Sequence, residues 1–114
     1  MKELGTNYNE KEIEEDSEAL KRIAVDLGIL LKKKNKDYSS SSFFLGFQGL
    51  WVHLFDKMKR IENKIVKKKE YEIDEKLMDS LMDLAGYAII GVRLCEKEKN
   101  IKFSKEQKTL EVKK

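Results

Sequence analysis

Three carboxylates stand four residues apart in the second half of the chain, at Glu75, Asp79 and Asp83. On a helix this spacing places the side chains in one row, where like charges repel one another. A hard divalent cation such as Mg²⁺ would offset the repulsion, because it prefers carboxylate oxygens and keeps positions for phosphate or water. The plainer interpretation is a solvated face screened by Lys76 and other lysines. The row is therefore a candidate metal site beside the apolar positions of its segment.

An upstream segment carries a second set of charged side chains. Asp56 and Arg60 are four residues apart, so they would form a surface ion pair on a helix. Alternatively, Asp56 joins the acidic row as a metal ligand and Arg60 grips a phosphate with its planar fork, while Lys57 adds a point charge. His53 lies one turn earlier, either as a ligand contact or as an ordinary polar residue. One histidine does not make a zinc site, and no nucleophile elbow supports a Ser-His-Asp hydrolase.

Two tyrosines are candidates for ligand contacts. Asp37 and Tyr38 precede four serines at 39–42, and this composition predicts a loop. Tyr38 would stack on a base while hydroxyl groups reach phosphate or sugar, or else the segment is a polar linker with Tyr38 held against the core. Tyr87 follows Asp83 by one turn. It would face the same ligand, or donate a hydrogen bond to a neighbouring carboxylate.

Three amphipathic segments would position these residues. Apolar residues recur at the spacing of one helix face, which predicts helices over about 10–34, 49–68 and 75–98. Asp74 is the expected N-cap of the third helix. The second helix has its apolar stripe at Trp51, Leu54, Phe55, Met58, Ile61 and Ile65, and the third at Leu77, Leu81, Leu84, Ala85, Ala88, Val92 and Cys95. We expect Trp51 and the phenylalanines to lie in the core.

Length and composition limit the class of protein. The 114 residues suffice for one all-α domain, a small bundle of three main helices completed by oligomerisation. We expect a flexible segment over 1–9, the domain over 10–103, and a tail or short helix over 104–114. A net charge of +3 argues against a duplex nucleic-acid binder. We read no signal peptide in the charged N-terminus and no apolar run of membrane-spanning length, and so expect a cytoplasmic protein without a membrane partner.

Three motifs in these segments are similar to those of a known family. The residues 34–39 resemble K-N-x-D-Y-G, and 52–61 resemble V-R-x-x-D-K-x-x-R-L. The most specific stretch, 74–88, resembles N-E-S-x-x-D-T-x-x-D-L-A-x-Y-A. The chain thus resembles the phage-associated nucleotide modification associated domain 1 family. It resembles more distantly the all-α nucleoside triphosphate pyrophosphohydrolases of the MazG type.

The resemblance implies an all-helical, oligomeric fold that binds a nucleotide and holds Mg²⁺ on helix carboxylates. By position, the catalytic and metal-binding acidic set would be Asp56, Glu75, Asp79 and Asp83. Lys57 and Arg60 would face phosphate. Ser39, His53 and Lys76 depart from the family motif, and the paired glutamates of the MazG type are missing from the second helix.

Three functions are then in competition. The leading hypothesis is a phage-derived, nucleotide-binding homo-oligomer in the host cytoplasm. As an enzyme, it would hydrolyse (deoxy)nucleoside triphosphates to the monophosphate and pyrophosphate with Mg²⁺. The second is a non-catalytic protein that sequesters a linear or cyclic signalling nucleotide during host defence. The third is a structural helical interaction module.

Overall fold

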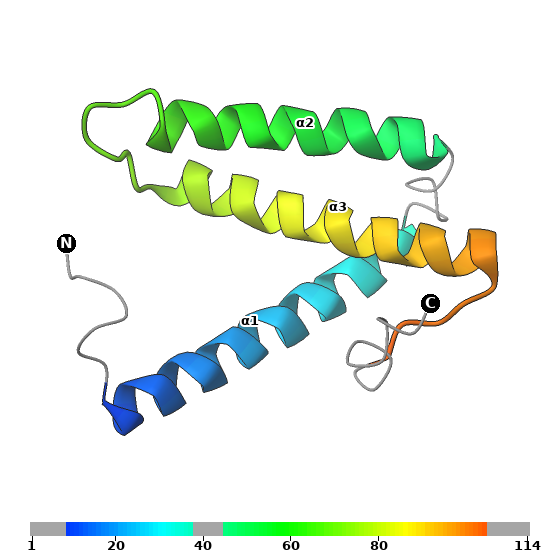
Figure 1. Cartoon of the computed structure of the whole chain (residues 1–114), viewed down its shortest axis with the longest axis horizontal. Helices are drawn as coiled ribbons and strands as arrows, with labels where there is room; N and C mark the ends of the chain where they lie inside the picture. The colour runs from blue at the N-terminus through cyan, green and yellow to red at the C-terminus, as the bar shows by residue number, and fades with distance from the viewer. Residues whose placement is uncertain (1–8, 38–44, 105–114) are drawn as a thin grey trace. The chain divides into compact units, whose positions relative to one another are not determined.

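Helices make up all the regular structure in the described residues, 9–37 and 45–104, of the computed structural model (Figure 1). They are α1 (Glu10–Asp37), α2 (Gly46–Ile65) and α3 (Glu75–Lys99), which confirms the predicted all-α fold. The chain divides into two compact units, Met1–Asp37 and Tyr38–Lys114, and each is described here by itself. None of the described helices is long and apolar enough to cross a membrane. The expectation of one domain over 10–103 stays a prediction.

Helix α1 begins after a cap that the sequence reading missed. The Asn9 side-chain oxygen accepts a hydrogen bond from the Glu12 backbone amide at 2.8 Å, as expected of an asparagine N-cap. At the other end, residues 35–37 are helical, so the prediction that this segment begins a loop was wrong. The Lys33 Nζ lies 3.0 Å from Asp37 Oδ2, one turn away. This pair adds a small stabilisation to the last turn, which extends the helix three residues past the predicted end at residue 34.

Helix α3 follows its predicted course. The side chain of Asp74 accepts a hydrogen bond from the Leu77 amide at 2.9 Å, so Asp74 is the N-cap. The helix ends at Asn100, which adopts the left-handed conformation with φ of 55°. Asparagine tolerates this conformation better than most residues and commonly stops a helix. The following chain is held by Glu96, whose carboxylate accepts from the Phe103 amide at 2.9 Å.

Helices α2 and α3 form an antiparallel hairpin (Figure 1). Helix α2 starts and ends three residues earlier than predicted, and residues 66–74 connect it to α3. The helices approach closely at Gly91, where an added Cβ would lie 2.8 Å from Leu50 Cδ2. The limit on side-chain size at this position therefore comes from the neighbouring Leu50 side chain rather than from backbone conformation.

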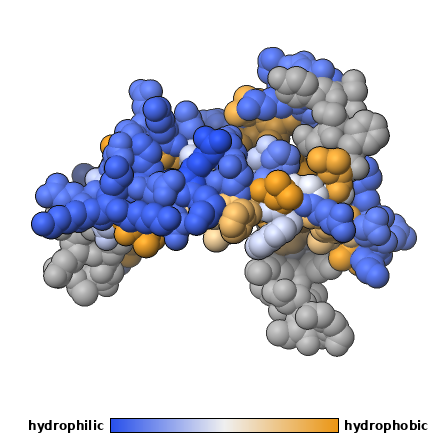
Figure 2. Space-filling view, turned by 90° about the horizontal axis from the view of Figure 1, so that it is seen from above, coloured by the Kyte–Doolittle hydropathy of each residue, from blue (hydrophilic) through white to orange (hydrophobic). Residues whose placement is uncertain are grey.

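The predicted core positions of the hairpin are only partly buried. Leu77 and Leu94 are buried, whereas Trp51 is 62% exposed and Phe55 is 52% exposed. The expectation that Trp51 and the phenylalanines lie in the core was wrong for the described ones, while Phe43 and Phe44 lie outside the described residues. In Figure 2 apolar side chains, in orange, reach the surface between hydrophilic ones. Within the described residues 45–104 the hairpin has only two helices, so no third helix of this segment covers the part of each apolar stripe that faces away from the partner helix.

Candidate functional site

A lysine links the two helices of the hairpin at the centre of the candidate site. Lys57 Nζ on α2 lies 3.1 Å from Asp83 Oδ2 on α3, and 4.0 Å from Asp56 Oδ2. The Lys57 side chain is only 18% exposed, whereas that of Asp83 is 46% exposed. The alkyl part of Lys57 is therefore covered while its ammonium group reaches polar partners. The predicted carboxylate and the predicted phosphate-binding lysine are thus in direct contact.

One turn from this ion pair, an aromatic pair spans the same two helices. The rings of His53 on α2 and Tyr87 on α3 are stacked, with centroids 4.5 Å apart and planes inclined by 4°. The helices are antiparallel, so moving back one turn on α2 corresponds to moving forward one turn on α3. His53 and Tyr87 were predicted as ligand contacts separately. Their contact with each other was not predicted, because sequence does not give the register between helices.

The third part of the site is Arg60 with Asp56. Arg60 Nε donates to Asp56 Oδ2 at 3.1 Å, and both side chains are more than half exposed. This is the ion pair expected from the spacing of four residues. The side chains that lie together are named the polar face below: His53, Asp56, Lys57 and Arg60 from α2, with Asp83 and Tyr87 from α3.

The rest of the acidic row does not join the polar face. Glu75 and Asp79 are exposed on α3, and their side chains form no hydrogen bond or ion pair in the described structure. The physical reason is helix geometry. Four residues exceed one turn, so each step along the row rotates the side chain by about 40°. Asp83 lies beside α2, and the two earlier carboxylates turn progressively away from it.

The described residues do not fit a preformed magnesium site. No group of three or more His, Cys, Asp or Glu side chains in 9–37 and 45–104 could hold a metal ion. The Lys57 ammonium lies next to both Asp56 and Asp83, in the position that a cation between them would take. Magnesium binding therefore stays a prediction from the sequence.

The remaining predicted ligand residues belong to another part of the chain. Asp37 ends α1, where its carboxylate pairs with Lys33. Tyr38 lies outside the described residues, so its predicted contact with a base stays a prediction.

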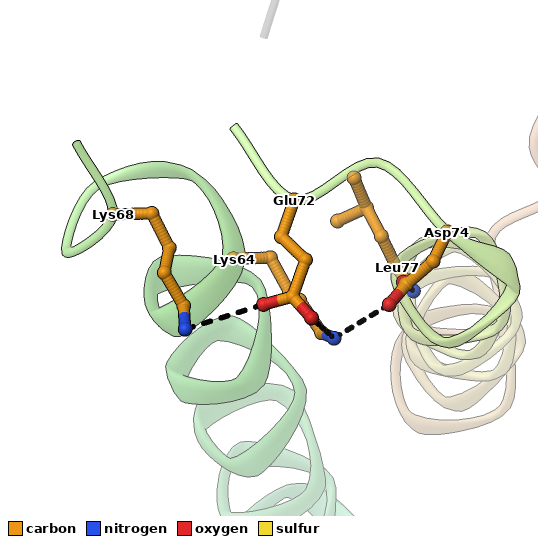
Figure 3. Close-up of polar contacts among 5 residues, drawn as sticks. All are labelled: Lys64, Lys68, Glu72, Asp74 and Leu77. Carbon is orange, nitrogen blue, oxygen red and sulfur yellow. Dashed lines mark hydrogen bonds and ion pairs between the residues drawn. The ribbon is translucent and has the colours of Figure 1, made fainter. Parts of the chain in front are cut away.

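Sequence reasoning missed a second polar cluster, at the start of α3 (Figure 3). Lys64 Nζ on α2 lies 2.7 Å from Asp74 Oδ2 and 3.1 Å from Glu72 Oε2, and Lys68 adds a contact to Glu72 at 3.3 Å. The hydrogen bonds that the Lys64 ammonium group donates to Asp74 and Glu72 raise the pKa of Lys64 above its ordinary value. The same bonds lower the pKa of both carboxyl groups, helped at Asp74 by the Leu77 amide. The cluster ties the connection to α2 and fixes where α3 begins.

The polar face combines two kinds of group, cations and aromatic rings. Lys57 and Arg60 can donate to an anionic oxygen, and Arg60 uses only its Nε toward Asp56 in the contact described above. The stacked aromatic rings of His53 and Tyr87 lie one turn from these cations. Cations next to an aromatic surface suit a ligand that combines an anion with a ring.

The hairpin with its polar face defines a small all-α protein in which cationic, acidic and aromatic side chains lie together on one side of two helices. A family model described as nucleotide modification associated domain 1 matches residues 34–93. This range includes every residue of the polar face and more than half of the chain, so the chain belongs to the nucleotide modification associated domain 1 family. No curated protein and no solved structure matches it significantly. The more distant likeness to MazG-type enzymes stays a prediction.

Proposed function

We propose that the polar face of the α2–α3 hairpin binds a nucleotide. The observation that carries the proposal is the contact between Lys57 and Asp83, one turn from the stacked rings of His53 and Tyr87. Cations and an aromatic surface therefore lie side by side. Membership of a family associated with nucleotide modification supports the choice of a nucleotide among anionic ligands.

In the proposed complex, Lys57 and Arg60 donate hydrogen bonds to phosphate oxygens, and the base lies against the aromatic pair. Both cations already have carboxylate partners, Asp83 and Asp56. A phosphate must compete with these partners, so binding has an electrostatic cost that a singly charged ligand overcomes poorly. We therefore expect tighter binding as the number of phosphate charges rises, and weaker binding as salt screens these half-exposed groups.

The site is tested by comparing two lysines on the same helix. Lys57→Met removes the cation of the polar face, whereas Lys59→Met removes one that pairs with Glu62 at 2.9 Å. Hydrogen bonds to charged groups contribute about 1.5–3 kcal/mol, so Lys57→Met should weaken nucleotide binding by roughly 10- to 100-fold. An ion pair with a half-exposed partner contributes about 0–1 kcal/mol to stability, so the fold should be retained.

The measurement is calorimetric titration with a panel of mono-, di- and triphosphate and cyclic nucleotides, in EDTA and then in Mg²⁺. Lys59→Met should bind as the wild type does. If no nucleotide binds, or if the two variants bind equally well, the proposal is wrong. Measuring the Mg²⁺ series separately also tests the predicted cofactor.

The same samples separate catalysis from sequestration. Pyrophosphate release from a triphosphate would support the hydrolase of the MazG type. A nucleotide recovered intact after denaturation, identified by its mass, would support the non-catalytic protein that sequesters a nucleotide. Because the described residues lack a group of metal ligands, binding without turnover is the simpler outcome to expect.

A further inference from the structure

Each cation of the polar face is paired with a carboxylate of the same face. Lys57 Nζ lies 3.1 Å from Asp83 Oδ2, and Arg60 Nε lies 3.1 Å from Asp56 Oδ2. With His53 neutral, these two cations and two carboxylates give the face no formal charge. A phosphate arriving from solvent therefore meets no excess of positive charge, although Lys57 and Arg60 are the groups that would bind it.

The two ion pairs differ in how easily they admit a third partner. Arg60 contacts Asp56 through Nε, and a guanidinium group carries further N–H donors that can reach a phosphate while this contact persists. Lys57 has only its ammonium group, which lies 3.1 Å from Asp83 and 4.0 Å from Asp56, on a side chain that is 18% exposed. A phosphate can therefore reach Lys57 Nζ chiefly from the directions that carboxylates now occupy.

Asp83 is the member of the Lys57 pair that can move aside. Its side chain is 46% exposed, so a change of rotamer turns the carboxylate into water. Lys57 would have to expose its covered alkyl stem to leave the pair, which is unfavourable. Asp56 does not take over the contact, because it is beyond hydrogen-bond distance of Lys57 and Arg60 holds it.

We infer that Asp83 is an internal competitor of the ligand, whose carboxylate occupies the place of a phosphate on Lys57. The inference rests on the proposed function, because it concerns regulation of the same nucleotide site. Competition of this kind lowers the affinity for every anion that binds Lys57. A small anion without a ring is then held too weakly to occupy the site, whereas a nucleotide gains further contacts with His53 and Tyr87.

Asp83 thereby acts as a specificity-determining residue. This role differs from that of a metal ligand, which the family resemblance implies for the same residue. The two roles predict opposite effects of removing the charge: a competitor holds the ligand off, whereas a metal ligand helps to hold it. Titration in EDTA tests the competitor alone, because no divalent cation is then present.

Asp83→Asn is the decisive variant, because asparagine has nearly the same size as aspartate and no charge. It should bind the nucleotides of the panel described above about 3- to 10-fold more tightly than the wild type in EDTA. Release of a half-exposed ion pair accounts for up to about a fivefold gain. The loss of repulsion between the carboxylate and the phosphates adds to it.

The matched control is Glu98→Gln, which removes one negative charge from an exposed position of the same helix. Glu98 lies about 22 Å along α3 from Asp83, more than twice the screening length of about 10 Å at 0.1 M salt. Glu98→Gln should therefore bind as the wild type does. Far-ultraviolet circular dichroism should show the same helix content in the wild type and both variants.

A second comparison shows whether the gain passes through Lys57. In a Lys57→Met background, titrated at correspondingly higher protein and ligand concentrations, Asp83→Asn should give a smaller gain, because no ammonium group is left to release. Equal gains with and without Lys57 would overturn the inference, since Asp83 would then act by repulsion alone.

The outcomes also separate this inference from the proposed function. If the wild type binds nucleotides and Lys57→Met weakens binding, but Asp83→Asn binds no more tightly than the wild type, the inference is wrong and the proposed function stands. If neither the wild type nor Asp83→Asn binds any nucleotide, the proposed function is wrong and the inference falls with it. Tighter binding by Asp83→Asn that depends on Lys57 supports both.

Discussion

Replacing Gly91 with valine tests how closely α2 and α3 approach each other. A Cβ at this position would lie 2.8 Å from Leu50 Cδ2, roughly 1 Å inside ordinary carbon–carbon contact. Valine adds two further methyl groups to a buried position, and overpacking of this kind costs about 1–3 kcal/mol. Its better helix propensity returns only a few tenths of a kcal/mol relative to glycine. We therefore expect Gly91→Val to lower the free energy of unfolding by about 1–3 kcal/mol.

Alanine at the same position should behave differently. It gains about 0.8–1 kcal/mol in helix propensity over glycine. Its single methyl group displaces only the end of the Leu50 side chain, at a cost of about 0.5–1.5 kcal/mol for a strained rotamer. These two effects nearly cancel, so the stability of Gly91→Ala should lie within about 0.5 kcal/mol of the wild type.

The free energy of unfolding of both variants is measured by urea unfolding at one fixed protein concentration. Trp51 fluorescence follows the transition, because Trp51 lies on α2. A double-mutant cycle with Leu50→Ala then isolates the contact. Removing the Leu50 methyl groups should make room for valine, giving a coupling free energy of at least about 1 kcal/mol. If the effects of Gly91→Val and Leu50→Ala simply add, the two residues do not touch and the close approach is refuted.

Three further outcomes follow from described contacts. Lys64 lowers the pKa of Glu72 and Asp74 below their ordinary values of 4.5 and 3.8. The stability that these two carboxylates contribute is therefore present above those values and lost as the pH falls through their lower folded values. Acid unfolding followed by circular dichroism between about pH 5 and pH 2 should show a smaller loss of stability in Asp74→Asn than in the wild type. The pKa of Lys64 is raised above 10.5, so the stability that Lys64 contributes is present below that pH and lost as the pH rises through its folded value. An alkaline titration should therefore show a smaller loss of stability in Lys64→Met than in the wild type. Gly28→Ala meets no atom within 4 Å and should stabilise α1 by about 1 kcal/mol, seen as slower amide hydrogen exchange.

The helices and several of their local contacts could be predicted from the sequence. Apolar residues at helical spacing located all three helices, and Asp74 was identified as a cap because its side chain needs only the next turn. The Asp56–Arg60 pair was predicted for the same reason, since both residues belong to one helix. Contacts of this kind depend on a few consecutive residues, so helix geometry determines them.

Contacts between segments could not be predicted in the same way. The stacking of His53 on Tyr87 depends on the register of α2 against α3, which the spacing within either helix does not contain. Lys64 was overlooked because its partner Glu72 lies in the connection, whose course follows from the fold. The acidic row was expected to converge on Asp56, but the drift of four-residue spacing carries Glu75 away from α2.

The apolar stripe of α2 was predicted correctly as a stripe and wrongly as a core. Periodicity shows that Trp51, Leu54 and Phe55 are on one broad side of the helix. It does not show which part of that side meets α3. Leu54 is half-buried in the hairpin, whereas Trp51 and Phe55 lie further round and are exposed.

The sequence Asp56-Lys57-Met58 places an exposed carboxylate, the largely covered lysine that joins the helices, and an exposed apolar side chain at three consecutive positions. Successive residues on a helix differ by about 100° in direction, so the angular phase of α2 assigns a different environment to each. A single residue inserted before Asp56 would rotate every later side chain of α2 by about 100° relative to α3. Asp56 and Met58 would then both lose the surroundings that they have now. Helix α2 should therefore tolerate exchange of side chains far better than any change in its length.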